Sequence, residues 1–142
     1  MANIADDITE LVGNTPLLRL HKFEKEAGFE GKILAKLEVF NPTGSVKDRI
    51  AKNMIEQAER DGRLKPGGTI IEATSGNTGI GLAAIAAAKG YQAVIVMPDS
   101  MSKERIRILE AYGAKVVLTP GEKNMGGANE KAAEILEQTE NA

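Results

Sequence analysis

The segment Thr69–Met97, TIIEATSGNTGIGLAAIAAAKGYQAVIVM, contains the clearest pattern of secondary structure in the chain. Its two ends, Thr69–Ala73 and Ala93–Met97, are short runs rich in β-branched residues, which favours strands. The second run is continuously apolar, as is typical of a strand covered on both faces. Between them, Asn77–Lys89 has the composition of a helix and ends at Gly90, a residue suited to the left-handed conformation after a helix. This order predicts two parallel strands joined by a helical crossover.

The same alternation continues towards the C-terminus. A helix is predicted over Lys103–Tyr112, a third strand over Lys115–Thr119, and a further helix over Ala128–Gln138. The last of these places four apolar residues on one face, as a helix packed on a sheet requires: Ala128, Ala132, Ile135 and Leu136. We therefore expect an α/β fold with three layers, in which helices flank a mostly parallel open sheet.

The region before Thr69 has a weaker pattern. Pro16–Leu20 and Ile33–Val39 are strand candidates, and Ser45–Arg60 is predicted to be a helix. Apolar residues recur every four positions along that helix, which predicts that they face the core: Val46, Ile50, Met54 and Ala58. The glycine pairs Gly67-Gly68 and Gly126-Gly127 are both interpreted as turns.

Composition excludes several classes of function. The chain of 142 residues has a formal net charge of -2 and no basic stripe, so we expect no nucleic-acid partner. It has no cysteine, which excludes disulfides and thiolate metal sites, and we expect no metal. The opening MANIADDITE is too polar for a signal peptide, and the longest apolar stretch, Ile80–Ala88, is too short to span a membrane. These features predict a cytoplasmic location without membrane association.

The first motif with chemical meaning is Asn41–Arg49, NPTGSVKDR, a turn-forming cluster that runs into a helix. It places Lys47 in the first helical turn, where the helix dipole disfavours a positive charge. A partly buried Lys47 would therefore favour the neutral amine, the form that reacts with carbonyl groups to give Schiff bases. The alternative is an ordinary solvated lysine opposed by Asp48, and spacing alone favours that alternative.

The second motif is Thr74–Gly81, TSGNTGIG, which follows a predicted strand and opens a helix. Backbone N–H groups and the helix dipole favour an anion at such a position, which is also where open α/β sheets bind ligands. The hydroxyls of Thr74, Ser75 and Thr78 add donors. Glycines let the backbone approach a ligand closely. The motif predicts a site for a carboxylate or a phosphate.

Two other interpretations of this motif stay open. Ser75 or Asn77 could be no more than a helix N-cap. Alternatively, the glycines could form a nucleotide-binding turn, since Asp99 lies about 20 residues on, where the dinucleotide fingerprint places an acid. The glycine spacing is G-x-x-G-x-G, however, and the fingerprint is G-x-G-x-x-G.

Longer segments resemble the β-family of pyridoxal-phosphate (PLP) enzymes, also called fold type II. That family includes cysteine synthase, cystathionine β-synthase, threonine synthase and serine dehydratase. The resemblance spans nearly the whole chain and is strongest to O-acetylserine sulfhydrylase, the cysteine synthase branch, because threonine synthases tend to carry an aromatic residue at Val46 and cystathionine β-synthases usually have an N-terminal haem-binding extension. The segments that carry it are ITELVGNTPLLRL, KLEVFNPTGSVKDR, IIEATSGNTGIGLA and VIVMPDSMSKERIRILEAYGAKVVLTPG.

The resemblance implies a cofactor and a set of site residues. By it, Lys47 is the catalytic lysine that holds PLP as a Schiff base, and Asn77 contacts the cofactor. Thr74, Ser75, Asn77 and Thr78 would bind the substrate carboxylate. The implied reaction converts O-acetylserine and sulfide to cysteine and acetate.

The resemblance also implies an arrangement of domains and partners. Residues 1–34 would belong to a larger domain, and residues 35–142 would form the small α/β domain that carries the lysine and the carboxylate loop. Homodimerisation and a complex with serine acetyltransferase are expected of the family. The family's glycine-rich phosphate loop has no counterpart here, so we expect a chain that is the N-terminal half of such an enzyme and is inactive alone. A non-catalytic binding module, a split half that needs a C-terminal partner, and a nucleotide-binding domain are the alternatives.

Overall fold

The computed structural model describes residues 4–142 and contains a parallel sheet of three strands. The strands are β3 (Thr69–Ala73), β4 (Gln92–Pro98) and β5 (Lys115–Thr119), in the spatial order β3-β4-β5. Both pairings are parallel, as the crossover pattern predicts. The predicted strands are confirmed, and β4 lies in the centre of the sheet.

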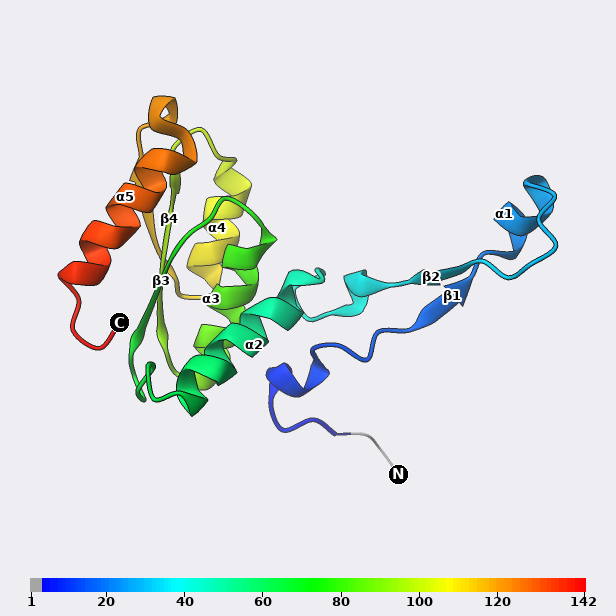
Figure 1. The fold of residues 1–142 in the computed structure, drawn as a ribbon, viewed down its shortest axis with the longest axis horizontal. Helices are drawn as coiled ribbons and strands as arrows, with labels where there is room; N and C mark the ends of the chain where they lie inside the picture. Colours follow the sequence, from blue (N-terminus) through cyan, green and yellow to red (C-terminus); the bar gives the residue numbers. More distant parts are fainter. Residues whose placement is uncertain (1–3) are drawn as a thin grey trace.

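Helices cover both faces of this sheet (Figure 1). The helices α3 (Asn77–Lys89) and α4 (Lys103–Ala111) pack on one face, and α5 (Asn124–Glu137) packs on the other. The predicted three-layer α/β fold is therefore confirmed. A further helix, α2 (Lys47–Arg60), packs on the outside of α3. Its first residue is the lysine of the NPTGSVKDR motif.

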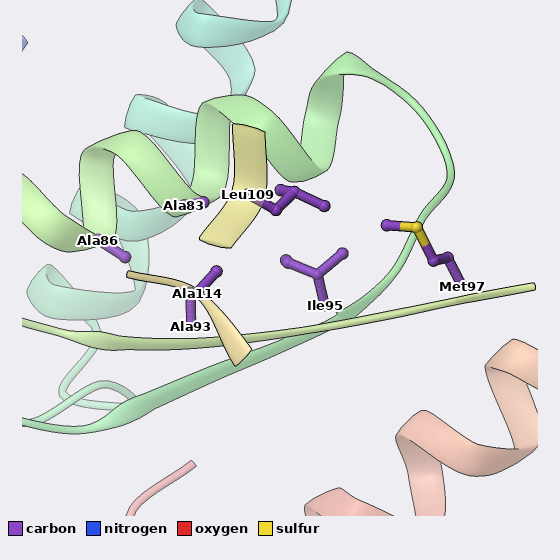
Figure 2. Close-up of a cluster of buried hydrophobic side chains, with 7 residues drawn as sticks. All are labelled: Ala83, Ala86, Ala93, Ile95, Met97, Leu109 and Ala114. Carbon is purple, nitrogen blue, oxygen red and sulfur yellow. The ribbon is translucent and has the colours of Figure 1, made fainter. Parts of the chain in front are cut away.

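The side chains of β4 fill the core on both sides of the sheet. Ile95 and Met97 are fully buried towards α3 and α4, where they meet Leu109 and a group of alanines (Figure 2). Val94 and Val96 are buried on the opposite face, towards α5. The alanines of α3 let this helix approach the sheet closely, which explains why so alanine-rich a segment is buried.

The apolar face predicted for α2 is wrong for three of its four residues, and only Ala58 among them packs against the core. Val46, Ile50 and Met54 are 41–43% exposed, whereas the apolar residues that pack against α3 are Ala51 and Ile55. The reason lies in the opposing glycine of α3: a Cβ added to Gly81 would stand 3.1 Å from the Cβ of Ala51. The two helices approach so closely at this point that only a small side chain fits opposite Gly81, which places Ala51 there and, one turn further on, Ile55 in the core.

The turn predicted at each glycine pair is present at one pair and absent at the other. Gly67 lies in a turn with φ +72°, as predicted, but Gly126-Gly127 lies inside α5, so the predicted turn is wrong there. The next residue, Ala128, is fully buried against the sheet. This packing outweighs the low intrinsic helix propensity of two glycines, which costs about 1 kcal/mol for each.

The N-terminal region forms an arm that extends away from the body (Figure 1). Its strands β1 (Leu17–Arg19) and β2 (Leu34–Lys36) pair antiparallel, and α1 (His21–Glu26) lies near its tip. Both strands are shorter than the predicted segments. The arm exposes several large apolar side chains: Leu17, Leu18, Phe23, Phe29 and Leu34.

The part of the chain that the structure describes also contains three short 3-10 helices: Ile8–Leu11, Glu38–Phe40 and Gly121–Lys123. Within residues 4–142, the longest helices are too short and too polar to cross a membrane.

A pair of glycine substitutions tests the close approach of α2 and α3. We expect Gly81→Ala to destabilise the chain by about 1–3 kcal/mol, because the new Cβ would also stand 3.2 Å from the carbonyl oxygen of Lys47, which cannot move away easily. Gly126→Ala is the matched control: nothing lies within 4 Å of its added Cβ, so it should stabilise α5 by about 0.5–1 kcal/mol. Chemical denaturation measures both changes, and equal effects of the two substitutions would contradict this account.

Candidate active site

The two motifs meet at the carboxyl end of β3. There the chain passes through Thr74, Ser75 and Gly76 into α3, and the beginning of α2 lies beside this loop. Ser45 joins the two segments: its Oγ lies 3.3 Å from Nδ2 of Asn77 and accepts a hydrogen bond from the N–H of Lys47 at 3.2 Å. The structure therefore brings Lys47 and the TSGN loop together, although they lie about 30 residues apart in the sequence.

Lys47 is the first residue of α2, and its side chain is exposed, as in the alternative of a solvated lysine and unlike the partly buried state that would favour the neutral amine. Its backbone is held between Ser45 and the close approach of Gly81. Among residues 4–142 no carboxylate pairs with its ammonium group, and the neighbouring Asp48 faces elsewhere. The amine is therefore available to a ligand.

Asp48 anchors the turn that precedes Lys47. Its side chain is fully buried, and its Oδ2 accepts a hydrogen bond from the backbone N–H of Thr43 at 2.7 Å. Its Oδ1 accepts a second hydrogen bond from the hydroxyl of Thr43. This explains the aspartate in NPTGSVKDR: it closes the turn over the start of α2 and so fixes where Lys47 stands.

A second polar cluster holds the outer side of the same turn. Glu38 accepts hydrogen bonds from Arg49, Lys36, Asn41 and Thr15, and the Nε of Arg49 lies 2.8 Å from its Oε2. These donors, with Arg49 the largest contributor, hold the pKa of Glu38 far below its usual value of 4.5. The cluster ties the base of the arm to α2.

The TSGN loop, Thr74–Asn77, leaves the N-terminus of α3 without a side-chain cap. The N-cap of α3 is Gly76, and no side chain caps this helix, so the interpretation of Ser75 or Asn77 as a simple N-cap is wrong. The N–H of Gly76 donates only a long hydrogen bond, 3.3 Å, to Oγ1 of Thr74. A Cβ on Gly79 would stand 2.7 Å from Cγ2 of Thr74, so glycine is required there for the helix to begin this close to the loop.

Two contributors to the site were missed by the sequence reasoning. Ser45 lies inside the quoted motif, and its hydroxyl next to Gly44 was the signal that could have identified it. Arg105 of α4 donates a hydrogen bond to the backbone carbonyl of Ser75. Nothing in the sequence around Arg105 points to this contact, because it joins residues 30 positions apart.

Comparison with known proteins identifies the class. The family model described as "Pyridoxal-phosphate dependent enzyme" matches residues 8–142, and the chain belongs to this family. The chain is 56% identical over 142 residues to the "Probable cysteine synthase" of Bacillus subtilis (strain 168), covering 100% of this chain and 45% of that protein. It is 59% identical over 117 residues to "Cystathionine beta-synthase" of Mus musculus, covering 82% of this chain and 21% of that protein.

A solved structure agrees with these sequence relatives. The crystal structure of cysteine synthase from Entamoeba histolytica superposes with a TM-score of 0.89 at 47% identity, covering 96% of this chain and 41% of that chain. The chain thus spans less than half the length of these relatives. PLP dependence is a property of the family, and the interpretation as a nucleotide-binding domain is not favoured.

The Glu38 cluster predicts how stability depends on pH. Because its pKa is lower in the folded chain than in the unfolded chain, Glu38 stabilises the fold above about pH 4.5, and this contribution is lost as the pH falls below that value. We expect Glu38→Gln to be less stable than the wild type at neutral pH and to lose less stability on acidification. Urea denaturation at about pH 7 and about pH 3.5 measures the difference. Glu10→Gln, at an exposed position, is the control, and an unchanged pH dependence in Glu38→Gln would contradict the prediction.

Proposed function

We propose that this chain supplies the cofactor lysine and the substrate-carboxylate loop of a PLP-dependent synthase that converts O-acetylserine and sulfide to cysteine and acetate. The observation that carries the proposal is the convergence of Lys47 and the Thr74–Asn77 loop through Ser45. The similarity to a probable cysteine synthase over the whole length of this chain supports this substrate pair.

The residues present fit the cofactor. Lys47, whose amine pairs with no carboxylate of the described residues, is the first residue of α2, and Asn77 is the first residue of α3. Within residues 4–142 the side chain of Asn77 makes one hydrogen bond, from its Nδ2 to Ser45. Lys47 would hold PLP covalently, and Asn77 would contact its ring. When bound, PLP acts as an electron sink for charge that develops at the substrate Cα.

Substrate binding and proton transfer would be carried out by residues of this chain. The hydroxyls of Thr74, Ser75 and Thr78, with the N–H groups at the start of α3, would bind the substrate carboxylate. A carboxylate fixed in this loop places the substrate Cα beside Lys47, because Ser45 holds both segments. Once its amine is free, Lys47 would accept the Cα proton, and the fixed geometry is what makes that transfer efficient.

The same proposal includes the division of the chain into two domains and the proteins with which it assembles. Residues 35–142 would form the small domain with the site, and residues 1–34, of which 1–3 lie outside the described part, would pack on a larger domain. The exposed apolar side chains of the arm support such packing. A homodimer, a complex with serine acetyltransferase and a cytoplasmic location complete the proposal.

The proposed function is tested with a hybrid polypeptide. Residues 1–142 are joined to the part of the Bacillus subtilis relative that follows the matched region, and cysteine formation from O-acetylserine and sulfide is assayed with and without PLP. We expect PLP-dependent cysteine formation by the hybrid and little by residues 1–142 or by the added part alone. A hybrid that folds and binds PLP but forms no cysteine would overturn the proposed substrates.

A further inference from the structure

Arg105 links α4 to the loop between β3 and α3. Its Nη1 donates a hydrogen bond to the carbonyl oxygen of Ser75, in the middle of that loop. The side chain is half-buried, and its own backbone N–H is held at 3.3 Å by Oγ of Ser102, the N-cap of α4. Arg107, two residues further on, is exposed and bonds to none of the described side chains, so the contact is particular to Arg105.

The hydrogen bond fixes the orientation of one peptide group. In a trans peptide the carbonyl and the N–H of the next residue point in opposite directions. With its carbonyl directed at Arg105, the Ser75–Gly76 peptide therefore directs the N–H of Gly76 away from α4. On that side this N–H meets Oγ1 of Thr74, the hydroxyl at the other end of the loop.

Little else holds this peptide. Gly76 carries no side chain and can adopt many backbone conformations, and an added Cβ there would have no neighbour closer than 4.0 Å. No side chain caps α3 at this residue. A glycine peptide without such support rotates readily, so the charged hydrogen bond from Arg105 is the contact that selects one orientation.

We propose that Arg105 is a positioning residue: it fixes the Ser75–Gly76 peptide so that the N–H of Gly76 is presented to the carboxylate of an α-amino acid bound in the Thr74–Asn77 loop. The identity of that ligand rests on the proposed function. Arg105 acts through the peptide and does not touch the ligand. Its charge also polarises the carbonyl of Ser75, which makes the N–H of Gly76 a stronger donor.

The first test examines the peptide itself and needs no ligand. The amide resonance of Gly76 is recorded by NMR for the whole chain and for Arg105→Met, Arg105→Lys and the matched control Arg107→Met. We expect the Gly76 peak to shift or broaden in Arg105→Met, to move back part of the way in Arg105→Lys, and to stay in place in Arg107→Met. Resonances of α5 report whether each variant is folded. A Gly76 peak in Arg105→Met at the wild-type position and width would overturn the proposal.

The second test measures binding of the ligand class. O-acetyl-L-serine is titrated into each variant, and the dissociation constant is read from the amides of the loop. Loss of a hydrogen bond to a charged group should weaken binding by about tenfold in Arg105→Met and leave Arg107→Met unchanged. Wild-type affinity in Arg105→Met would count against the role of Arg105. An absence of binding in the wild-type chain would count against the proposed function instead, while the Gly76 resonance still decides the positioning role.

Discussion

Replacing Lys47 with alanine is expected to abolish site-specific attachment of PLP. In the wild-type chain, PLP followed by borohydride reduction should modify Lys47 in preference to other lysines, because its amine is exposed, unpaired among the described residues and next to the loop that we propose to bind an anion. Peptide mapping by mass spectrometry locates the label. In the active hybrid, Lys47→Ala should lower kcat on the order of 10³-fold or more, as expected for the loss of a reacting group.

The control for this experiment lies on the same helix. Lys52 bonds to the backbone carbonyl of Thr9 at 2.9 Å, so its amine is engaged, and Lys52→Ala should keep the label at Lys47. Lys22, which is 90% exposed and pairs with Glu26 at 3.8 Å, reports the background reaction of a solvent-exposed surface lysine. Two results would argue that Lys47 has no special role. One is equal labelling of Lys22 and Lys47 at limiting PLP. The other is undiminished labelling, in Lys47→Ala, of the peptide that contains position 47.

The second large effect is expected at Asp48. Asp48→Ala removes a fully buried side chain with both acceptors of the Thr43 hydrogen bonds and leaves the half-buried backbone N–H of Thr43 without this partner, which should cost about 2–4 kcal/mol in the free energy of unfolding. The turn before Lys47 loses its anchor at the same time. We therefore also expect slower labelling of Lys47 under conditions in which the variant is still folded.

Two further variants test whether the loss of the hydrogen-bond acceptors of Asp48 causes the loss of stability. Asp48→Asn keeps the shape of the side chain and one acceptor for the N–H of Thr43, so it should lose less stability than Asp48→Ala. Asp6→Ala, at an exposed position, should leave stability within about 0.5 kcal/mol of the wild type. Urea denaturation of the three variants measures these differences. Comparable stability of Asp48→Ala and Asp6→Ala would show that the buried carboxylate does not anchor the turn.

Some features of the site were predictable because they depend on short stretches of chain. The apolar run of β4 must be covered on both faces in any fold. The residue that ends α3 adopts φ +77°, a left-handed conformation that glycine, here Gly90, adopts readily. Likewise, a loop with hydroxyls and glycines between a strand and a helix has the donors for an anion whatever surrounds it. These elements were therefore recovered with nearly the right bounds.

Other features depended on which surfaces meet. A period of four in α2 predicted that Val46, Ile50 and Met54 face the core, but the close approach of Gly81 selects the face with Ala51 instead. Two glycines in succession favoured a turn, and only the packing of α5 on the sheet makes them helical. In both cases tertiary contacts outweighed local propensity.

The α/β class, the order of strands and helices, and the two motifs could be predicted from the amino-acid sequence, because each is encoded within a few consecutive residues. The meeting of the two motifs could not, since it depends on Ser45 lying between Lys47 and Asn77 and on Asp48 and Arg105 holding the adjoining turn and loop. Hydrogen bonds between distant segments depend on how helices pack on the sheet, and a linear pattern does not specify that packing. Lys47 can thus be identified as a candidate site residue from its neighbours in the sequence, whereas the residues that surround it in space depend on the fold.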